Sequence, residues 1–229
     1  MYTSKAPPMA RTLRVLAKLL NYPDGDLRQH LDELREAIYQ ERALPVQHLA
    51  EIDALISIIE RQSAIDAEAD YVQLFDSGRR TSLHLFEHVH GDSRDRGPAM
   101  IDLVQTYEKA DLFLAEGQMP DHLPVVLEYA STQPPPEARA FLAEMAHIFN
   151  AIFNALEQRG SAYASVLGAL LELAGEAARP VTVPDEELVD DTWAEPAAFD
   201  GCSSQGQARP GQPQPVHLVR NNACKGARL

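Results

Sequence analysis

Apolar side chains that recur every three or four residues are the feature that most constrains this chain. The longest such stripe falls between residues 137 and 156, and its spacing places the side chains on one face of a helix. Because the stripe is wide, we expect a central helix of the core. Its members are Phe141, Leu142, Met145, Ile148, Phe149, Ile152, Phe153 and Leu156.

Shorter stripes with the same period run through most of the first 180 residues. Turn residues separate them, and no alternation typical of strands is visible. We therefore predict an all-α fold, with one globular domain over residues 1–180 and about eight or nine helices. The predicted helices cover residues 10–20, 27–38, 49–59, 66–75, 79–91 and 98–114, a segment that begins at 123, and residues 137–156 and 163–174.

The helical periodicity is lost beyond residue 180. Residues 185–200 hold seven acids and no Lys or Arg, with a few apolar side chains between them. We interpret residues 181–200 as an acidic docking segment. Residues 201–229 are rich in Gly, Pro, Gln and Ser, a composition typical of a disordered tail.

The net charge of the chain restricts the classes of partner that it can bind. A net charge of −14 argues against nucleic acid and anionic membrane surfaces, since both select for clustered Lys and Arg. A basic or apolar peptide fits better. The start of the chain has no long apolar segment, and no run of about 18 apolar residues occurs. We therefore expect a cytoplasmic protein with no stable membrane insertion, and its two cysteines, Cys202 and Cys224, predict no disulfide framework.

An Asp-His pair midway along the chain is the first candidate site. Glu116 and a turn precede Pro120, Asp121 and His122, and an apolar run begins at Leu123. Asp121 could cap the helix that begins near Leu123, which the residues alone favour. Alternatively, Asp121 and His122 could bind a polar group in a groove.

Two further groups leave similar alternatives open. Tyr71 and Phe75 have the spacing of core residues, but a groove wall would use the same side chains. Arg79 and Arg80 could grip a carboxylate or a phosphate, or they could form a solvated helix start.

His84, Glu87 and His88 match a zinc-peptidase pattern in which two imidazoles hold the metal and a Glu acts as base. No downstream residue has the character of the third ligand, so a short surface helix is the simpler interpretation. No other catalytic signature is visible, which favours a binding protein over an enzyme. A plain helical scaffold is a further alternative.

These motifs together resemble a known family. Tyr71-x-x-Leu74-Phe75, followed by Glu116-x-x-x-Pro120-Asp121-His122-Leu123-Pro124, resembles the TorD-like redox-enzyme maturation chaperones. Two further stretches resemble the branch of respiratory nitrate reductase assembly chaperones. They are Arg79-Arg80-x-Ser82-Leu83-x-Leu85 and His90-Gly91-Asp92-Ser93-Arg94-x-Arg96-Gly97.

The resemblance implies an all-α, non-catalytic chaperone with no cofactor of its own. Its client would be the apo catalytic (alpha) subunit of a respiratory nitrate reductase, or the alpha-beta complex. It would bind the N-terminal peptide of that subunit, a remnant of a twin-arginine signal, while molybdenum guanine-dinucleotide cofactor is inserted.

The resemblance also implies a peptide site around the Asp-His motif. We expect Asp121 and Glu116 at the rim of a groove, and His122 to tune binding between about pH 5 and 8. The groove walls would come from residues 101–114 and from the run after Leu123. The expected peptide-binding residues are Tyr71, Phe75, Arg79, Arg80, Tyr107, Glu116, Pro120, Asp121, His122 and Leu123.

Overall fold

The computed structural model describes residues 8–91 and 93–181, and within these ranges it contains helices and no strand. The all-α prediction is confirmed. The elements are α1 (Ala10–Leu19), α2 (Gly25–Gln29), α3 (Leu31–Glu41), α4 (Val46–Arg61), α5 (Ala64–Phe75), the 3-10 helix η1 (Arg79–Thr81), α6 (Leu85–Val89), α7 (Arg96–Glu108), α8 (Leu123–Thr132), α9 (Pro135–Glu144), α10 (Ala146–Gln158) and α11 (Ala164–Ala174).

The predicted histidine-rich helix at 79–91 is replaced by η1 and the shorter α6. Two longer predicted helices are each divided in the structure. The His30 N–H donates to the Leu27 carbonyl, which ends α2 before α3 begins. Met145 donates to the Leu142 carbonyl and separates α9 from α10 in the same way. Neither break contains Gly or Pro, so the sequence carries no signal for it. The described part of the chain therefore holds more helices than the eight or nine expected.

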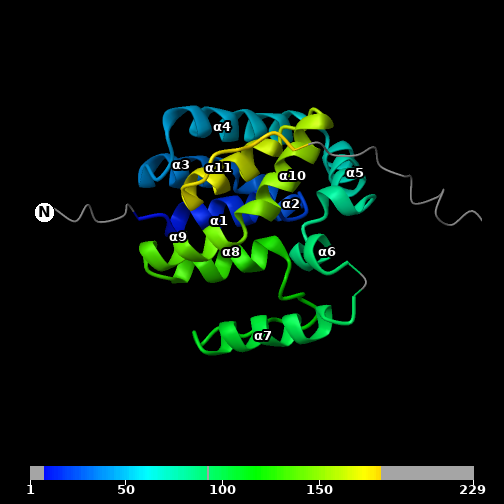
Figure 1. Ribbon diagram of the computed structural model, residues 1–229. Coiled ribbons are helices and arrows are strands. Elements are labelled where there is room, and N and C mark those ends of the chain that lie inside the picture. Colours follow the sequence, from blue (N-terminus) through cyan, green and yellow to red (C-terminus); the bar gives the residue numbers. More distant parts are fainter. Residues whose placement is uncertain (1–7, 92, 182–229) are drawn as a thin grey trace, which may run out of the picture. The chain divides into compact units, whose positions relative to one another are not determined.

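The core forms around α1 and α11. The first helix packs between α3 and α8, and Leu13 and Leu16 on it are fully buried. Helix α11 packs against α10, α9 and α4. In Figure 1, α4, α10 and α11 lie above α8 and form a bundle with α1. The wide stripe predicted from the sequence is buried along α10, at Phe149 and Ile152 among others.

Helix α7 lies at the edge of this bundle (Figure 1). Ile101, Val104 and Tyr107 have the spacing of a buried helix face, but Ile101 is 59% exposed and Tyr107 is the only buried residue of the helix. The predicted extension to residue 114 is also wrong. Asp111 takes a left-handed backbone (φ 58°), and the Leu112 N–H returns to the Tyr107 carbonyl at 3.0 Å, so the chain folds back.

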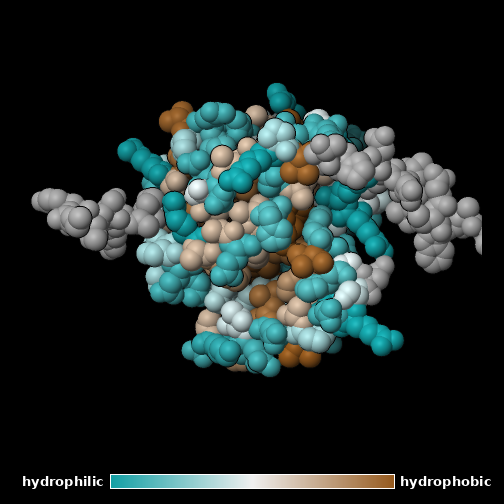
Figure 2. Space-filling view, in the orientation of Figure 1, coloured by the Kyte–Doolittle hydropathy of each residue, from teal (hydrophilic) through white to brown (hydrophobic). Residues whose placement is uncertain are grey.

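Figure 2 shows apolar surface gathered where α6, α8 and α7 meet on this face of the molecule. The predicted acidic segment at 181–200, apart from Val181, and the predicted tail at 201–229 lie outside the described residues. Within residues 8–91 and 93–181, none of the helices combines the length and the apolar character needed to cross a bilayer.

Tyr71 and Phe75 lie in the core, inside an aromatic cluster. The ring centroids of Tyr71 and Phe75 are 4.8 Å apart, and Tyr163 packs edge-on against both. The Tyr71 hydroxyl donates to the Leu20 carbonyl at 2.8 Å, which ties α5 to the end of α1. The core interpretation of this pair is therefore confirmed.

A Tyr71→Phe substitution should lower the free energy of unfolding by about 1 kcal/mol, because it removes this buried hydrogen bond and keeps the ring. Chemical denaturation of both proteins measures the difference. Tyr39→Phe is the matched control, since Tyr39 is an exposed tyrosine of α3. Equal stabilities of Tyr71→Phe and Tyr39→Phe would show that the hydroxyl of Tyr71 contributes nothing.

Candidate functional site

A short antiparallel bridge joins the Asp-His motif to the histidine-rich segment. Residues His84 and His122 face each other across it. The Leu85 N–H donates to the Asp121 carbonyl at 3.0 Å, and the Leu123 N–H donates to the Leu83 carbonyl at 2.8 Å. Two motifs that lie far apart in the sequence are therefore neighbours.

The Asp121 carboxylate is fully buried at the centre of this bridge. It accepts a hydrogen bond from the Phe86 N–H at 3.2 Å and lies 3.3 Å from His84 Nδ1. The Arg96 guanidinium approaches it to 3.7 Å from the start of α7. These contacts compensate for burying the charge, which would otherwise be costly.

Asp121 therefore caps α6, and not the helix that follows it. The residue before α8 is His122, whose side chain makes no capping hydrogen bond. The prediction that Asp121 lies at an exposed rim is also wrong. Its partners are the imidazole of His84 and the guanidinium of Arg96, both of the same chain.

The two bridged histidines have opposite pKa shifts. Their ring centroids are 5.1 Å apart. The hydrogen bond to Asp121 raises the pKa of His84. Burial, followed by the charge of His84, lowers the pKa of His122 to about 4. We expected His122 to titrate between pH 5 and 8. Its lowered pKa contradicts this expectation, and the cause is its removal from water.

The zinc-peptidase pattern is not assembled into a metal site. His84 faces Asp121, and His88 Nε2 lies 2.9 Å from the Ser82 carbonyl. Glu87 pairs with Arg96 at 3.6 Å. No group of three His, Cys, Asp or Glu side chains that could hold a metal ion occurs within residues 8–91 and 93–181. The hydrolase alternative therefore gains no support from the arrangement of these residues.

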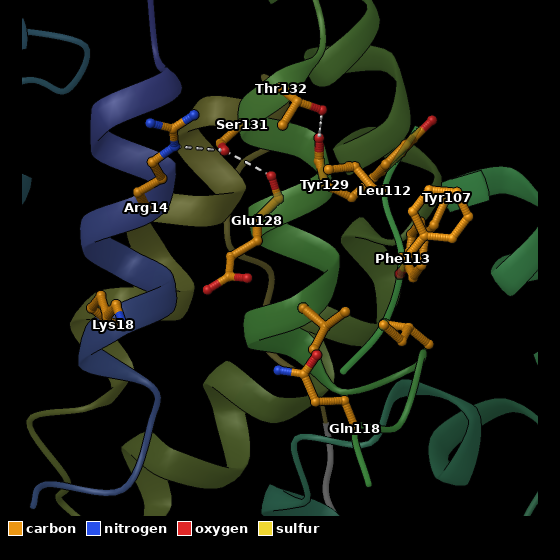
Figure 3. Close-up of a pocket in the computed structure, with 12 residues that line it drawn as sticks. Arg14, Lys18, Tyr107, Leu112, Phe113, Gln118, Glu128, Tyr129, Ser131 and Thr132 are labelled. Carbon is orange, nitrogen blue, oxygen red and sulfur yellow. Dashed lines mark hydrogen bonds between the residues drawn. The ribbon is translucent and has the colours of Figure 1, made fainter. Parts of the chain in front are cut away.

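A pocket of about 360 Å³ lies on the outer face of α8. Figure 3 shows α1 on one side of α8, with Arg14 and Lys18, and Tyr107 and Phe113 on the other side. Two segments predicted as groove walls, residues 101–114 and the run after Leu123, thus border one pocket. Its lining residues are Arg14, Lys18, Tyr107, Leu112, Phe113, Leu114, Gln118, Val125, Glu128, Tyr129, Ser131 and Thr132.

Aromatic side chains form the apolar side of the pocket. The rings of Tyr107 and Tyr129 pack at a tilt with centroids 5.0 Å apart, and Phe141 packs edge-on against Tyr129 at the same distance. The Tyr107 hydroxyl donates to the Pro120 carbonyl at 2.8 Å, which links the pocket to the buried bridge. Phe113 is 78% exposed, so an apolar ligand would find an uncovered ring there.

Charged groups stand on the other side. Arg14 Nε donates to Ser131 Oγ at 3.1 Å, and Ser131 in turn donates to the Glu128 carbonyl at 2.7 Å (Figure 3). Neither Arg14 nor Lys18 forms an ion pair within the part of the chain that the structure describes. The pocket thus combines an aromatic wall with two cations and one carboxylate, that of Glu128.

The predicted site residues fall into three groups. Tyr107 lines the pocket, and Glu116 stands on an exposed turn whose ends, Leu114 and Gln118, line it. Other predicted residues lie inside the protein, namely Tyr71, Phe75, Pro120, Asp121 and Leu123, while His122 is half-buried. Arg79 and Arg80 lie on η1 and do not line the pocket.

The sequence prediction missed several lining residues, including Arg14, Lys18, Phe113 and Tyr129. Arg14 and Lys18 are four residues apart on the polar face of the first helix, which reads as ordinary solvated surface. Phe113 lies just beyond the end of α7. Only its exposure, which the sequence does not show, marks it as unusual.

An Asp121→Asn substitution should lower the free energy of unfolding by about 2–3 kcal/mol, because a buried charged acceptor with three donors nearby is lost. Denaturation with urea measures the change. Glu116→Gln, an exposed acid of the same motif, should stay within about 0.5 kcal/mol of the parent. An Asp121→Asn protein as stable as Glu116→Gln would contradict the capping role.

The stability of the protein should fall on acidification partly because of His122. The folded pKa is about 4 against an ordinary 6.5, so between these values the unfolded chain binds a proton that the folded chain does not. The pKa of His84 is raised in the folded protein, so its effect on stability has the opposite sign. Protonation of His84 stabilises the folded state below the ordinary pKa of 6.5, and this stabilisation is lost as the pH rises through the folded-state pKa.

A His122→Gln variant should therefore lose less stability than the parent between pH 7 and about pH 5. Urea unfolding at both pH values gives the two differences. His147→Gln, at an exposed position of α10, is the control and should follow the parent. The same pH dependence in His122→Gln and the parent would refute the assigned shift.

Comparison with known proteins identifies the family. The family model described as nitrate reductase delta subunit matches residues 21–168. The nitrate reductase molybdenum cofactor assembly chaperone NarJ of Escherichia coli K12 is 40% identical over 200 residues, which cover 86% of this chain and 84% of that protein. The probable assembly chaperone NarW of the same strain is 36% identical over 163 residues, with 71% and 68% covered.

A solved structure shares the fold. A putative redox enzyme maturation protein from Archaeoglobus fulgidus superposes with a TM-score of 0.52 at 19% identity, over 73% of this chain and 94% of that one. At that identity the likeness concerns the fold alone. The match to the family model and the identity to NarJ show that this chain belongs to the nitrate reductase delta subunit family.

Proposed function

We propose that this chain is an assembly chaperone for a respiratory nitrate reductase and that it binds the N-terminal peptide of the apo catalytic subunit. Its membership of the delta subunit family and its 40% identity to a molybdenum cofactor assembly chaperone support this role. The client is the alpha subunit, alone or in the alpha-beta complex. The chaperone holds it in the cytoplasm while molybdenum guanine-dinucleotide cofactor is inserted, without catalysis and without a cofactor of its own.

The pocket on α8 is the observation that carries the peptide-binding proposal. A short amphipathic helix can place its apolar face in a hydrophobic groove, with anchors spaced one turn apart. Tyr107, Tyr129 and the exposed Phe113 offer such a groove wall. A basic residue of the peptide would meet Glu116, on the turn that adjoins this wall.

The other charges of the protein would guide the peptide to the pocket and set its orientation there. A net charge of −14 draws a basic peptide towards the protein from solution. Arg14 and Lys18 line the α1 side of the pocket and would repel basic residues there. The basic end of the peptide would therefore lie away from α1, and its helical C-terminus, with a negative dipole end, could face these cations.

In this proposal the buried members of the motif act indirectly. Asp121 and Leu123 hold the bridge, and Pro120 accepts the hydrogen bond that positions Tyr107. Substituting them would change stability together with binding. Phe113 is a better probe, because its exposed ring can be removed without disturbing the core.

The experiment is calorimetric titration of the full chain with a synthetic peptide of about 15 residues, or roughly four helical turns, from the start of the nitrate reductase catalytic subunit. Saturable binding is expected. Phe113→Ala should weaken it about tenfold or more, since burying a phenylalanine ring contributes about 1.5–3 kcal/mol and 1.4 kcal/mol is a factor of ten.

Tyr39→Ala is the matched control, an exposed aromatic residue on α3 that does not line the pocket, and it should bind like the parent. Absence of any binding to the parent would contradict peptide recognition. Binding that Phe113→Ala leaves unchanged would place the peptide elsewhere on the protein.

A further inference from the structure

Helix α5 has an apolar stripe on the face that points away from the core. Its inner face is buried at Ala67, Tyr71 and Phe75. On the outer face Ile65 is 77% exposed, and Val72 is also exposed. With Ala69 between them, these side chains fall at positions i, i+4 and i+7, which lie along one side of a helix. The domain's own core leaves this stripe uncovered.

The stripe lines an open groove of about 590 Å³. Tyr22, from the segment before α2, forms part of its lining. The lining continues along α5 to Asp76 and Ser77. The twelve residues of α5 span about 18 Å at 1.5 Å per residue, a length that suits a partner helix of about three turns.

Carboxylates border the groove and give it a negative charge. Glu68 and Asp76 both line it. Neither forms an ion pair with a Lys, Arg or His within residues 8–91 and 93–181. Helix α5 itself contains no Lys or Arg. Partial desolvation, followed by the carboxylates of Glu68 and Asp24, raises the pKa of Tyr22, as expected for a phenol in a negative field.

The outer face is held in place independently of its own side chains. The inner aromatic residues anchor α5, and the Arg159 guanidinium donates to the Gln73 and Leu74 carbonyls at 3.5 and 3.3 Å, near the C-terminal end of the helix. Polar substitutions at Ile65 and Val72 therefore change the surface and leave the helix in position.

We propose that the outer face of α5 is a docking surface for an amphipathic helix of a partner protein, with Lys or Arg residues beside its apolar stripe. Ile65, Ala69 and Val72 take the apolar stripe of the partner, and Glu68 and Asp76 pair with its cations. This surface goes beyond the peptide site on α8, since the two sets of lining residues have no member in common.

The charges also argue against other occupants. A second copy of the chain would bring the same acidic face in a symmetric dimer, and like charges would oppose each other. An anionic lipid surface would be repelled for the same reason. A basic amphipathic helix satisfies both the apolar stripe and the carboxylates.

The test uses the full chain and two synthetic helical peptides of about 14 residues, one of Leu and Lys and one of Leu and Glu, each with its leucines on one face. In calorimetric titrations the Leu/Lys peptide should bind, and the Leu/Glu peptide should not. Replacing both apolar side chains, Ile65→Ser with Val72→Ser, should weaken the binding at least tenfold. Glu68→Gln with Asp76→Asn should weaken it and reduce its dependence on salt.

Tyr39→Ser with Val46→Ser is the matched control, since both residues are exposed and neither lines the groove, and it should bind like the parent. Circular dichroism establishes that each variant remains folded. The proposal is overturned if the α5 variant binds the Leu/Lys peptide like the parent, or if both peptides bind equally. It is also overturned if Phe113→Ala, and not the α5 variant, abolishes binding. The titration with the nitrate reductase peptide is a separate experiment on the pocket on α8, and its result does not depend on the outcome of this test.

Discussion

The buried carboxylate of Asp121 is the interaction on which the candidate site depends. It joins three elements that share few other contacts, namely the first turn of α6, the start of α7 through Arg96, and the segment that leads into α8. Because α7 has only one buried residue, its position depends on such polar links more than on apolar packing. The Tyr107 hydroxyl makes a similar polar link, since its hydrogen bond to the Pro120 carbonyl connects α7 to the bridge. The aromatic wall of the pocket is therefore positioned by hydrogen bonds.

The two surfaces assigned to partners differ in chemistry. The pocket on α8 presents aromatic rings with cations at one side, whereas the groove on α5 presents aliphatic side chains with carboxylates and no cation of its own helix. Both surfaces are proposed to take an amphipathic helix, but cations line one side of the α8 pocket and carboxylates line the α5 groove. The two proposed surfaces share no lining residue, so a segment bound at one would leave the other open. Such an arrangement suits a protein that must recognise a partner by more than one feature.

Much of the fold could be predicted from the sequence, because its helices follow apolar stripes with a clear period. Most residues of the stripes are buried in α1, α4, α10 and α11. The breaks at His30 and Met145 could not be predicted, since both use residues that a helix interior also accepts. The end of α7 was missed because an Asp in the left-handed region, and not a Gly, turns the chain at residue 111.

The candidate site was less predictable, since its geometry depends on pairing between distant segments. The resemblance led to Asp121 and His122, but a local pattern cannot show that the carboxylate turns inward to cap α6. Nor can it show that Arg14 and Lys18 on α1 come to face Glu128 on α8. Capping of a helix by its own preceding residue is the common case, and the sequence favoured it for that reason. In the structure Asp121 instead caps α6, by accepting a hydrogen bond from the Phe86 N–H, 35 positions away in the chain.

The bridge between His84 and His122 has a consequence for how the segment between them can vary. Between them the chain forms α6, which packs on α10, and then α7 and the turn at Gly117 at the edge of the helical body, before it returns to the same point. A segment whose two ends are pinned together can lengthen, shorten or change its composition without altering the spacing of the helices that precede and follow it. The part of the pocket wall that this segment carries, at Tyr107 and Phe113, can therefore change while the arrangement of the bundle stays the same.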